Sequence, residues 1–382
     1  TSLNGSFVSD DYKTGVYLFG MIRDRDSYDR NGDGFSDIPE LNSETVGFRA
    51  YYKTSPYTRL TAEYHHIHEF RRGGNAFDLP PHMADIAEQL NHKIDGGGLK
   101  FDWFSPDGRH RLGVYASAQR IGRDSYFGTD RNPDAYGATG DETFVAGTQY
   151  TYSFERLLFL PSELTAGVEY NYNALDDKYL GFGRDFRQTT RSTGFFFQNE
   201  WRSERLNFLV GGRVDKHNMM KNAVFSPRVN VRYSPTPAVG LRASYASGYR
   251  APQAYNEDLH IDALDNKVAV IRLDPNLRPE YSHSLSASVD LYRNFGRVQG
   301  NLLVEGFFTL EKVGEDEQGN VIKERRNAAG ATVAGIGVEA KAGIPGRFEF
   351  QLGYTFQRSR YDEPERWSDE VAPQRRMFRS PD

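Results

Sequence analysis

The strongest pattern along the chain is an alternation of apolar and polar residues with a period of two. Between 164 and 172 the even positions are apolar or aromatic, and the odd positions are small or polar. The stretches 285–291 and 348–356 alternate in the same way, and a shorter one runs from 99 to 103. Because successive side chains of a strand point to opposite faces, each stretch predicts a β-strand with one apolar face. The sequence therefore predicts an all-β protein of about 15–16 strands.

The connections between these strands alternate between short and long. Brief turns are expected near 55–56, 105–108, 202–205, 234–237, 293–296 and 344–346. Long polar segments lie near 25–43, 67–95, 120–141, 174–190, 215–225, 248–280, 311–330 and 357–376. Barrels of the bacterial outer membrane have this rhythm, with short periplasmic turns and long external loops, whereas soluble sandwiches and propellers do not require it. We therefore expect a transmembrane antiparallel up-and-down β-barrel.

The ends of the chain and its aromatic residues add two expectations. No closing strand is visible at either end, so residues 1–382 are expected to be an incomplete barrel, a fragment of one outer-membrane domain. No charged segment followed by an apolar core opens the sequence, so we expect a signal peptide to have been lost. Several aromatic residues fall at strand ends, as membrane interfaces favour, although strand propensity alone also favours them. They are Tyr150, Tyr152, Phe154, Tyr233 and Tyr245.

Composition narrows the possible classes of protein. The 23 Tyr, 26 Phe and 37 Gly suit a sheet better than packed helices. No stretch approaches the roughly 18 consecutive apolar residues that a spanning helix needs. The net charge of −5 and the scattered Lys and Arg provide no basic surface for nucleic acid. The absence of cysteine excludes disulfides, thiolate metal sites and cysteine nucleophiles.

Three motifs, in order along the chain, resemble those of the TonB-dependent receptor barrel. The first comprises residues 225–235 (FSPRVNVRYSP) and 241–252 (LRASYASGYRAP). The second, residues 274–280 (DPNLRPE), resembles the box that begins the return strand in this family. The third, residues 327–335 (NAAGATVAG), resembles a later motif that runs from Asn to Gly.

The resemblance implies a barrel of roughly 22 strands with an N-terminal plug. It also implies energy coupling to a TonB-type protein of the inner membrane and uptake of a bulky, scarce nutrient such as an iron-siderophore, haem or a corrinoid. Neither the plug nor the segment that binds the coupling protein is visible in this sequence. Two alternatives remain open: a passive porin or sugar channel, and a soluble β-rich module that binds calcium.

Residues 29–40 match the calcium-loop pattern D-x-[DN]-x-[DN]-G-x5-E. The candidate ligands are Asp29, Asn31, Asp33, Phe35 through its carbonyl, Asp37 and Glu40. Such oxygen donors are what calcium prefers, and Gly34 permits the sharp turn that the loop needs. The flanking segments read as strands rather than helices, and Pro39 precedes Glu40. A solvated Asp and Gly turn is therefore the alternative to a calcium site.

Two further groups are candidates for contact with a ligand. His66 and His68 share a strand face and have the spacing to bind a metal, although a polar rim without special role is the alternative. The ligand-binding candidates are Arg71, Arg72, Tyr249, Arg250 and His260. The arginine pair begins a long segment and can meet an anion, but such pairs are more often solvated. His260 lies between two motifs where, by resemblance, haem receptors carry an axial histidine.

No combination of residues indicates catalysis. The sequence has no glycine-rich phosphate loop, Ser-His-Asp order or carboxylate dyad of any specificity. We therefore expect a receptor or channel rather than an enzyme.

Overall fold

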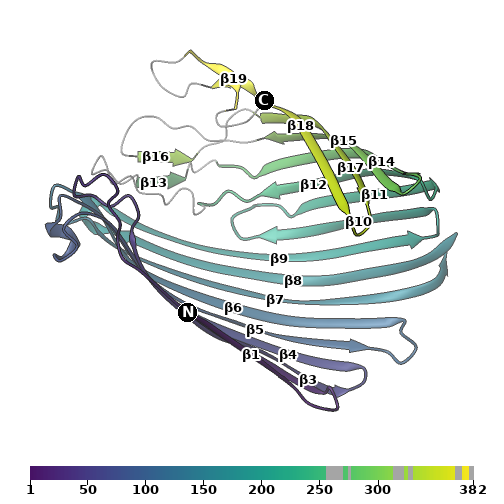
Figure 1. Ribbon diagram of the computed structural model, residues 1–382, viewed down its shortest axis with the longest axis horizontal. Helices are drawn as coiled ribbons and strands as arrows, with labels where there is room; N and C mark the ends of the chain where they lie inside the picture. The colour runs from purple at the N-terminus through teal and green to yellow at the C-terminus, as the bar shows by residue number, and fades with distance from the viewer. Residues whose placement is uncertain (255–269, 274–276, 313–321, 326–329, 366–371, 378–382) are drawn as a thin grey trace.

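The computed structural model describes residues 1–254, 270–273, 277–312, 322–325, 330–365 and 372–377. Most of them lie in strands (Figure 1). The first ten strands are β1 (Ser2–Val8), β2 (Thr14–Arg25), β3 (Glu40–Ser55), β4 (Thr58–Gly74), β5 (Ile86–Phe104), β6 (His110–Thr129), β7 (Tyr136–Leu157), β8 (Leu160–Tyr179), β9 (Arg184–Arg202) and β10 (Leu206–His217). The others are β11 (Val224–Thr236), β12 (Val239–Arg250), β13 (Val270–Leu273), β14 (Glu280–Phe295), β15 (Val298–Lys312), β16 (Ile322–Arg325), β17 (Gly330–Ile344), β18 (Phe348–Glu365) and β19 (Gln374–Arg376).

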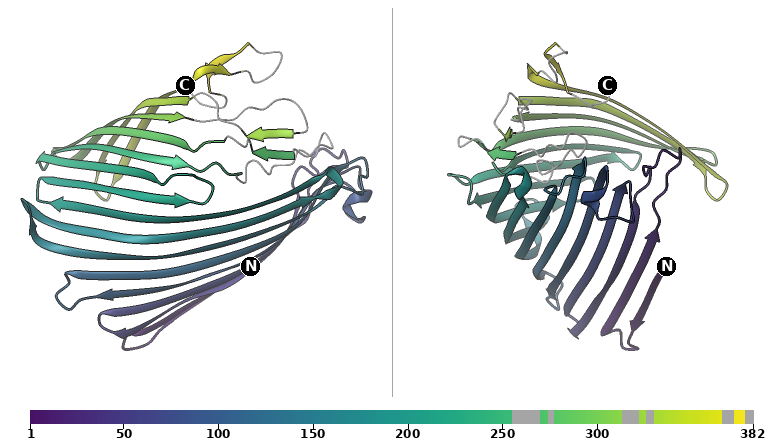
Figure 2. Two further views of the ribbon diagram at one scale, coloured as in Figure 1. Left: turned by 180° about the vertical axis from the view of Figure 1, so that it is seen from behind. Right: turned by 90° about the vertical axis from the view of Figure 1, so that its left-hand side faces the viewer.

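Seventeen of these strands form one antiparallel sheet in which neighbours in sequence pair with each other. The two remaining strands, β13 and β16, form a separate parallel pair. The main sheet curls into an open trough (Figure 2). Within the described residues β1 pairs only with β2, and β19 only with β18, so the sheet is not closed. The prediction of an all-β, up-and-down antiparallel fold is confirmed.

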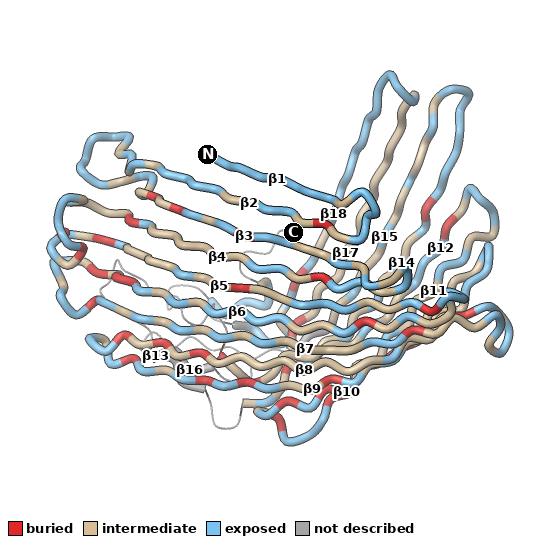
Figure 3. Tube along the Cα trace, turned by 90° about the horizontal axis from the view of Figure 1, so that it is seen from below, coloured by how far each residue is buried: buried red, intermediate tan, exposed pale blue. Residues whose placement is uncertain are grey.

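Each strand of the main sheet has one apolar and one polar face. On β18, Phe350, Leu352 and Phe356 are about half exposed or more and share a face, which continues through Ile336 of β17. The other face carries hydrogen-bonded polar side chains such as Gln351, which donates to Glu339 at 2.8 Å. We call these the outer face and the inner face. Few residues are fully buried (Figure 3), so the sheet has no continuous apolar core of its own.

On the inner face, aromatic rings lie over glycines of the neighbouring strand. A Cβ on Gly167 would come within 2.4 Å of the Phe196 ring, and one on Gly335 within 2.4 Å of the Phe307 ring. These glycines therefore give the rings room to lie flat against the backbone.

The short turns lie where the alternation predicts them, but one short turn carries no sequence signal. β7 and β8 are joined by Leu158 and Phe159, and Leu158 adopts a positive φ of 63°. Turns with positive φ usually contain Gly, Asn or Asp, so this apolar turn could not be recognised. The pairing of β7 with β8, which continues to Leu157 and Leu160, holds this hairpin turn in place.

The long connections are shorter than predicted because the strands continue into them. The segment expected near 67–95 is a connection only from 75 to 85, and the one near 120–141 only from 130 to 135. In these extensions both faces carry many polar residues among a few apolar ones, so the regular alternation disappears although the backbone ladder continues. Strands of up to 22 residues result, about twice the length that crosses a bilayer.

The two short helices are single turns in external connections. They are η1 (Pro81–Met83) and η2 (Leu180–Phe182). In the part of the chain that the structure describes, no helix is long and apolar enough to cross a membrane.

Candidate functional site: the inner wall and its external rim

The external rim is held together by one buried arginine at the end of β4. The Arg72 guanidinium donates to the carbonyls of Ala76, Phe77 and Leu79, at 2.9, 3.3 and 2.7 Å. The residue is 5% exposed. Because its hydrogen-bonding groups are directed at the loop backbone, Arg72 fixes the β4–β5 connection. A contact between Arg72 and an anionic ligand stays a prediction, since the contacts that the structure shows are those with its own loop.

Neighbouring connections are joined to this loop. Asp85 accepts hydrogen bonds from Asn75 at 2.9 Å and from Arg131 of the β6–β7 connection at 3.0 Å. The Asn75 contact and the Arg131 charge lower the pKa of Asp85. Beneath this link Ala84, Ala87, Tyr126 and Ala135 form a small apolar cluster, against which Phe182 of η2 packs. Three external connections therefore form one body at this edge of the sheet.

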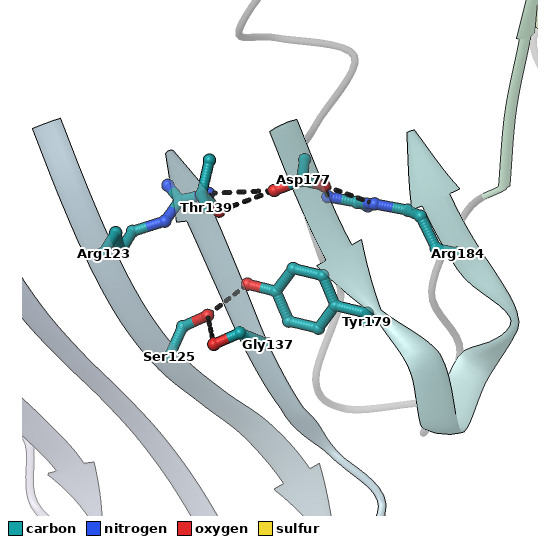
Figure 4. A network of polar contacts seen from close by, with 7 residues as sticks. All are labelled: Arg123, Ser125, Gly137, Thr139, Asp177, Tyr179 and Arg184. Atoms are coloured by element: carbon teal, nitrogen blue, oxygen red, sulfur yellow. Dashed lines mark hydrogen bonds and ion pairs between the residues drawn. The ribbon is translucent and has the colours of Figure 1, made fainter. Parts of the chain in front are cut away.

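Just inside the rim, Asp177 lies between two arginines on the inner face (Figure 4). Asp177 and Arg184 are fully buried and form an ion pair, and Arg123 approaches from the other side at 3.5 Å. Thr139 also donates to Asp177, at 2.6 Å. A buried carboxylate needs such partners because desolvation otherwise makes its charge costly. The network joins β6, β7, β8 and β9 across four adjacent strands.

Lower on the inner wall, a second network spans β6, β8 and β10. Arg213 donates to Glu169 at 3.2 Å and to Asp215 at 2.8 Å. Tyr115 also donates to Glu169, from two strands away. Farther around the sheet, Asp290 accepts from Arg242 at 3.2 Å. The wall therefore presents paired charges rather than an isolated one, which suits a water-filled or protein-filled interior.

The first residues after β12 are fixed to the inner wall three strands away. The Gln188 side chain of β9 donates to the Ala254 carbonyl at 3.1 Å and accepts from the Ala254 amide at 2.9 Å. Ala254 is 3% exposed and packs with Leu175 and Phe186. Because both amide atoms of Gln188 are engaged, the long connection between β12 and β14 starts on the inside of the sheet. We call this contact the Gln188 clamp.

The other ligand-binding candidates lie at the end of the strands or outside the described residues. Arg71 is exposed on the inner face, 3.1 Å from Glu69. Tyr249 lies opposite Tyr281 at the end of β12, and Arg250 lies opposite the buried Glu280 at 3.9 Å. His260 lies outside the described residues. The second motif does begin a return strand, since β14 starts at Glu280.

The predicted calcium loop forms a compact turn. Asp29 accepts hydrogen bonds from the amides of Gly32 and Gly34 at 2.7 and 2.8 Å, and Gly34 has a φ of 90°. Asp37 accepts from the amide of Arg30 at 2.7 Å. The hydrogen bond from the Gly34 amide has the largest effect on the pKa of Asp29, which it lowers, and the bond from the Gly32 amide lowers this pKa further. Glu40 instead begins β3 and pairs in register with Arg72.

The histidines of β4 have partners that the sequence did not reveal. His66 lies 2.8 Å from Asp95, which also accepts from Tyr64 at 2.7 Å. His68 lies 2.8 Å from Asn91. The β4–β5 register places Asp95 directly opposite His66, and it places Asn91 on the same face, two residues along β5 from Lys93, which lies opposite His68. Among the described residues, no group of three or more His, Asp or Glu side chains is placed to hold a metal ion.

The matched family agrees with this architecture. A family model described as TonB dependent receptor-like, beta-barrel matches residues 3–381. The chain belongs to this family. Members of the TonB-dependent receptor family are bacterial outer-membrane proteins, so the outer face of this barrel is the lipid face and the inner face lines the lumen. A search of curated proteins gives no match.

Solved structures of TonB-dependent receptors share the fold at low sequence identity. The siderophore receptor PirA from Acinetobacter baumannii is 13% identical with a TM-score of 0.70, covering 93% of this chain and 59% of its own. The alcaligin receptor FauA from Bordetella pertussis is 15% identical with a TM-score of 0.66, covering 94% and 59%. The ferric enterobactin receptor PfeA from Pseudomonas aeruginosa is 13% identical with a TM-score of 0.68, covering 93% and 62%. The chain thus spans about three fifths of the length of these receptors.

Proposed function

We propose that this barrel belongs to an outer-membrane receptor that takes up a ferric siderophore by TonB-dependent transport. The observation that carries the proposal is a lumen wall of paired charges beneath a rim of joined external connections. Such a wall is suited to contact with a polar plug and a large hydrophilic cargo. The similar solved structures are receptors for a siderophore, for alcaligin and for ferric enterobactin, which supports this choice among cargos.

Haem and corrinoids are the alternative cargos, and a passive porin is the alternative class. The haem alternative depends on His260, which lies outside the described residues. The porin alternative has less support, because the family model that matches residues 3–381 is that of the TonB-dependent receptor barrel. A siderophore receptor is therefore better supported than a porin.

An inner-membrane protein of the TonB type is the proposed energy source. A plug supplied by sequence outside this chain is proposed to contact the lumen network around Arg213. Paired charges in a wet interior allow such a contact to form and break, because surface ion pairs contribute only about 0–1 kcal/mol each.

We also propose that the loop 29–37 binds calcium through Asp29, Asn31, Asp33 and Asp37. The spacing of the oxygen donors and the turn at Gly34 support it. Glu40 is the weakest candidate ligand, because it is in register with Arg72 at the start of β3.

The cargo is tested by spectral and fluorescence titration of the complete receptor with a ferric catecholate siderophore, haem and cyanocobalamin. We expect saturable binding of the siderophore, and siderophore-dependent growth in iron-poor medium that is lost when the coupling protein is deleted. A haem-induced change in the absorption spectrum, without siderophore binding, would replace the siderophore with haem. Equal growth in the absence of the coupling protein would favour the porin.

A further inference from the structure

A polar pocket lies on the outer face of the barrel, across β5, β6, β7 and β8. It is formed by two adjacent rows of residues that are in register across these strands. The lower row is Lys93, Gly122, Gly140 and Asp176, and the upper row is Asn91, Asp124, Ala138 and Lys178. Arg123 and Thr139 lie between these positions and complete the lining of the pocket, while their side chains belong to the lumen network around Asp177.

The floor of the pocket consists of two glycines that the fold itself does not require. Gly122 and Gly140 stand directly opposite each other in the ladder, and a Cβ on either would meet nothing within 4 Å. Neither has a positive φ. Glycine within a strand costs about 0.5–1 kcal/mol relative to alanine. The missing side chains therefore leave space that favours an occupant from outside the chain.

The pocket walls offer both cations and hydrogen-bond acceptors. Lys93 is exposed and forms no ion pair with any side chain that the structure describes. Across the glycine floor, Lys178 lies 2.9 Å from Oδ2 of Asp176. The other oxygen of Asp176, Oδ1, is buried and has no hydrogen-bond partner among the described residues. A ligand that carries both an anionic group and hydroxyl donors would satisfy these groups together.

The height of the pocket identifies the kind of ligand. The last aromatic residues of the apolar band on these strands are Phe144 and Tyr172, which are paired in register. Gly140 lies four residues farther along β7, about 13 Å along a strand and about 10 Å in height after tilt. The headgroup layer of a simple phospholipid is only about 6 Å thick on each side. The occupant must therefore extend farther from the membrane than a phospholipid headgroup.

We propose that this pocket binds the phosphorylated sugar headgroup of an outer-leaflet glycolipid. Lys93 and Lys178 bind its phosphate, and Asp124 and Oδ1 of Asp176 accept hydrogen bonds from its hydroxyl groups, while the Asn91 oxygen stays with His68. The sugar lies on the glycine floor. The site depends on the membrane location of the barrel and not on its cargo.

Filling the pocket provides the main test. In the double variant Gly122→Val, Gly140→Val, each added Cβ meets no atom within 4 Å of the present structure and valine favours strands, so the barrel is expected to fold with unchanged or higher stability. We expect lipopolysaccharide retained by the complete receptor to fall about tenfold, measured by native mass spectrometry after mild extraction from outer membranes. The matched control is Gly306→Val, at a position in β15 that is equally open. Retention at the wild-type level in the double variant would overturn the proposal.

A second variant separates the phosphate from the sugar. Lys93→Gln is expected to weaken binding of lipopolysaccharide micelles but not of the same micelles after enzymatic dephosphorylation. The control is Lys100→Gln on the inner face, where Lys100 pairs with Asp102 at 2.9 Å. Equal loss for both forms of the lipid would contradict the phosphate contact, and binding of free inorganic phosphate alone would show an ion site without a glycolipid.

Discussion

Individual charged residues in this barrel act mainly by fixing neighbouring strands and loops. Asp177 is the clearest case, because two arginines and a threonine converge on one fully buried carboxylate. Removing one member of a buried pair leaves the others with an uncompensated charge, which typically costs about 3–5 kcal/mol. Replacing both members by apolar residues avoids most of that cost.

Asp177→Asn is therefore expected to lower barrel stability by about 3 kcal/mol. The measurement is the temperature at which the folded barrel loses its altered mobility in dodecyl sulfate gels. The double variant Asp177→Leu, Arg184→Met is the control, and we expect it to be more stable than the single variant. A single variant as stable as the wild type would show that the network does not hold these strands.

The calcium loop provides the second test at this scale. Removing two carboxylates takes charge and coordination from a hard-cation site, so Asp29→Ala with Asp33→Ala should abolish the heat of calcium binding in calorimetry. The pKa of Asp29 is lowered from 3.8, so its contribution to loop order is present above that value and is lost as the pH falls through the lowered pKa. Binding should thus persist at mildly acidic pH. Unchanged heat in the double variant would refute the assignment.

At the scale of elements, the polar extensions of the strands beyond the lipid band determine the geometry of the external side. β7 and β8 carry the ladder well past Phe144 and Tyr172, so the external connections start far above the membrane. The Gln188 clamp holds the first residues after β12, as far as Ala254, on the inner wall. A connection fixed at its base has fewer conformations to lose when it meets a ligand, which favours affinity.

Gln188→Ala should release the base of this connection without unfolding the barrel. The chain has no cysteine, so Ala251→Cys provides a unique site for a nitroxide spin label. We expect a more mobile electron paramagnetic resonance spectrum in Gln188→Ala than in the labelled parent. Gln198→Ala, ten residues farther along the same face of β9, is the control and should leave the spectrum unchanged. An unaltered spectrum in Gln188→Ala would show that other contacts hold the connection.

At the scale of the whole molecule, the two faces of the sheet decide how the barrel sits in the membrane. Leu352 projects from the outer face and is 61% exposed, whereas its neighbour Gln351 faces the lumen and donates to Glu339. An arginine on the lipid face near the midplane costs about 2–4 kcal/mol. An arginine on the lumen face can reach water.

Leu352→Arg is therefore expected to reduce insertion of the complete receptor, measured as the heat-modifiable fraction in outer membranes. Gln351→Arg is the matched control, one residue away on the opposite face, and should insert normally. If both variants insert equally well, the assignment of the two faces is wrong.

The sequence by itself determined the fold class, most of the short turns and the membrane location. A period of two survives wherever one strand face meets lipid, so Phe350 and Leu352 reveal both the strand and its lipid face. The three motifs indicated the family. Where both faces meet water, the pattern no longer marks the strand, and the lengths of the external connections were overestimated for that reason.

Only the tertiary structure decided which residues meet across strands. Register places Asp95 beside His66, and Gly122 beside Gly140, although no local pattern links these positions. The sequence predicted that Arg72 contacts a ligand, and the structure shows it buried and bonded to its own loop. Residue type and spacing in the sequence indicate from which face of a strand a side chain projects. The residue that it contacts on the next strand depends on pairings between segments distant in sequence.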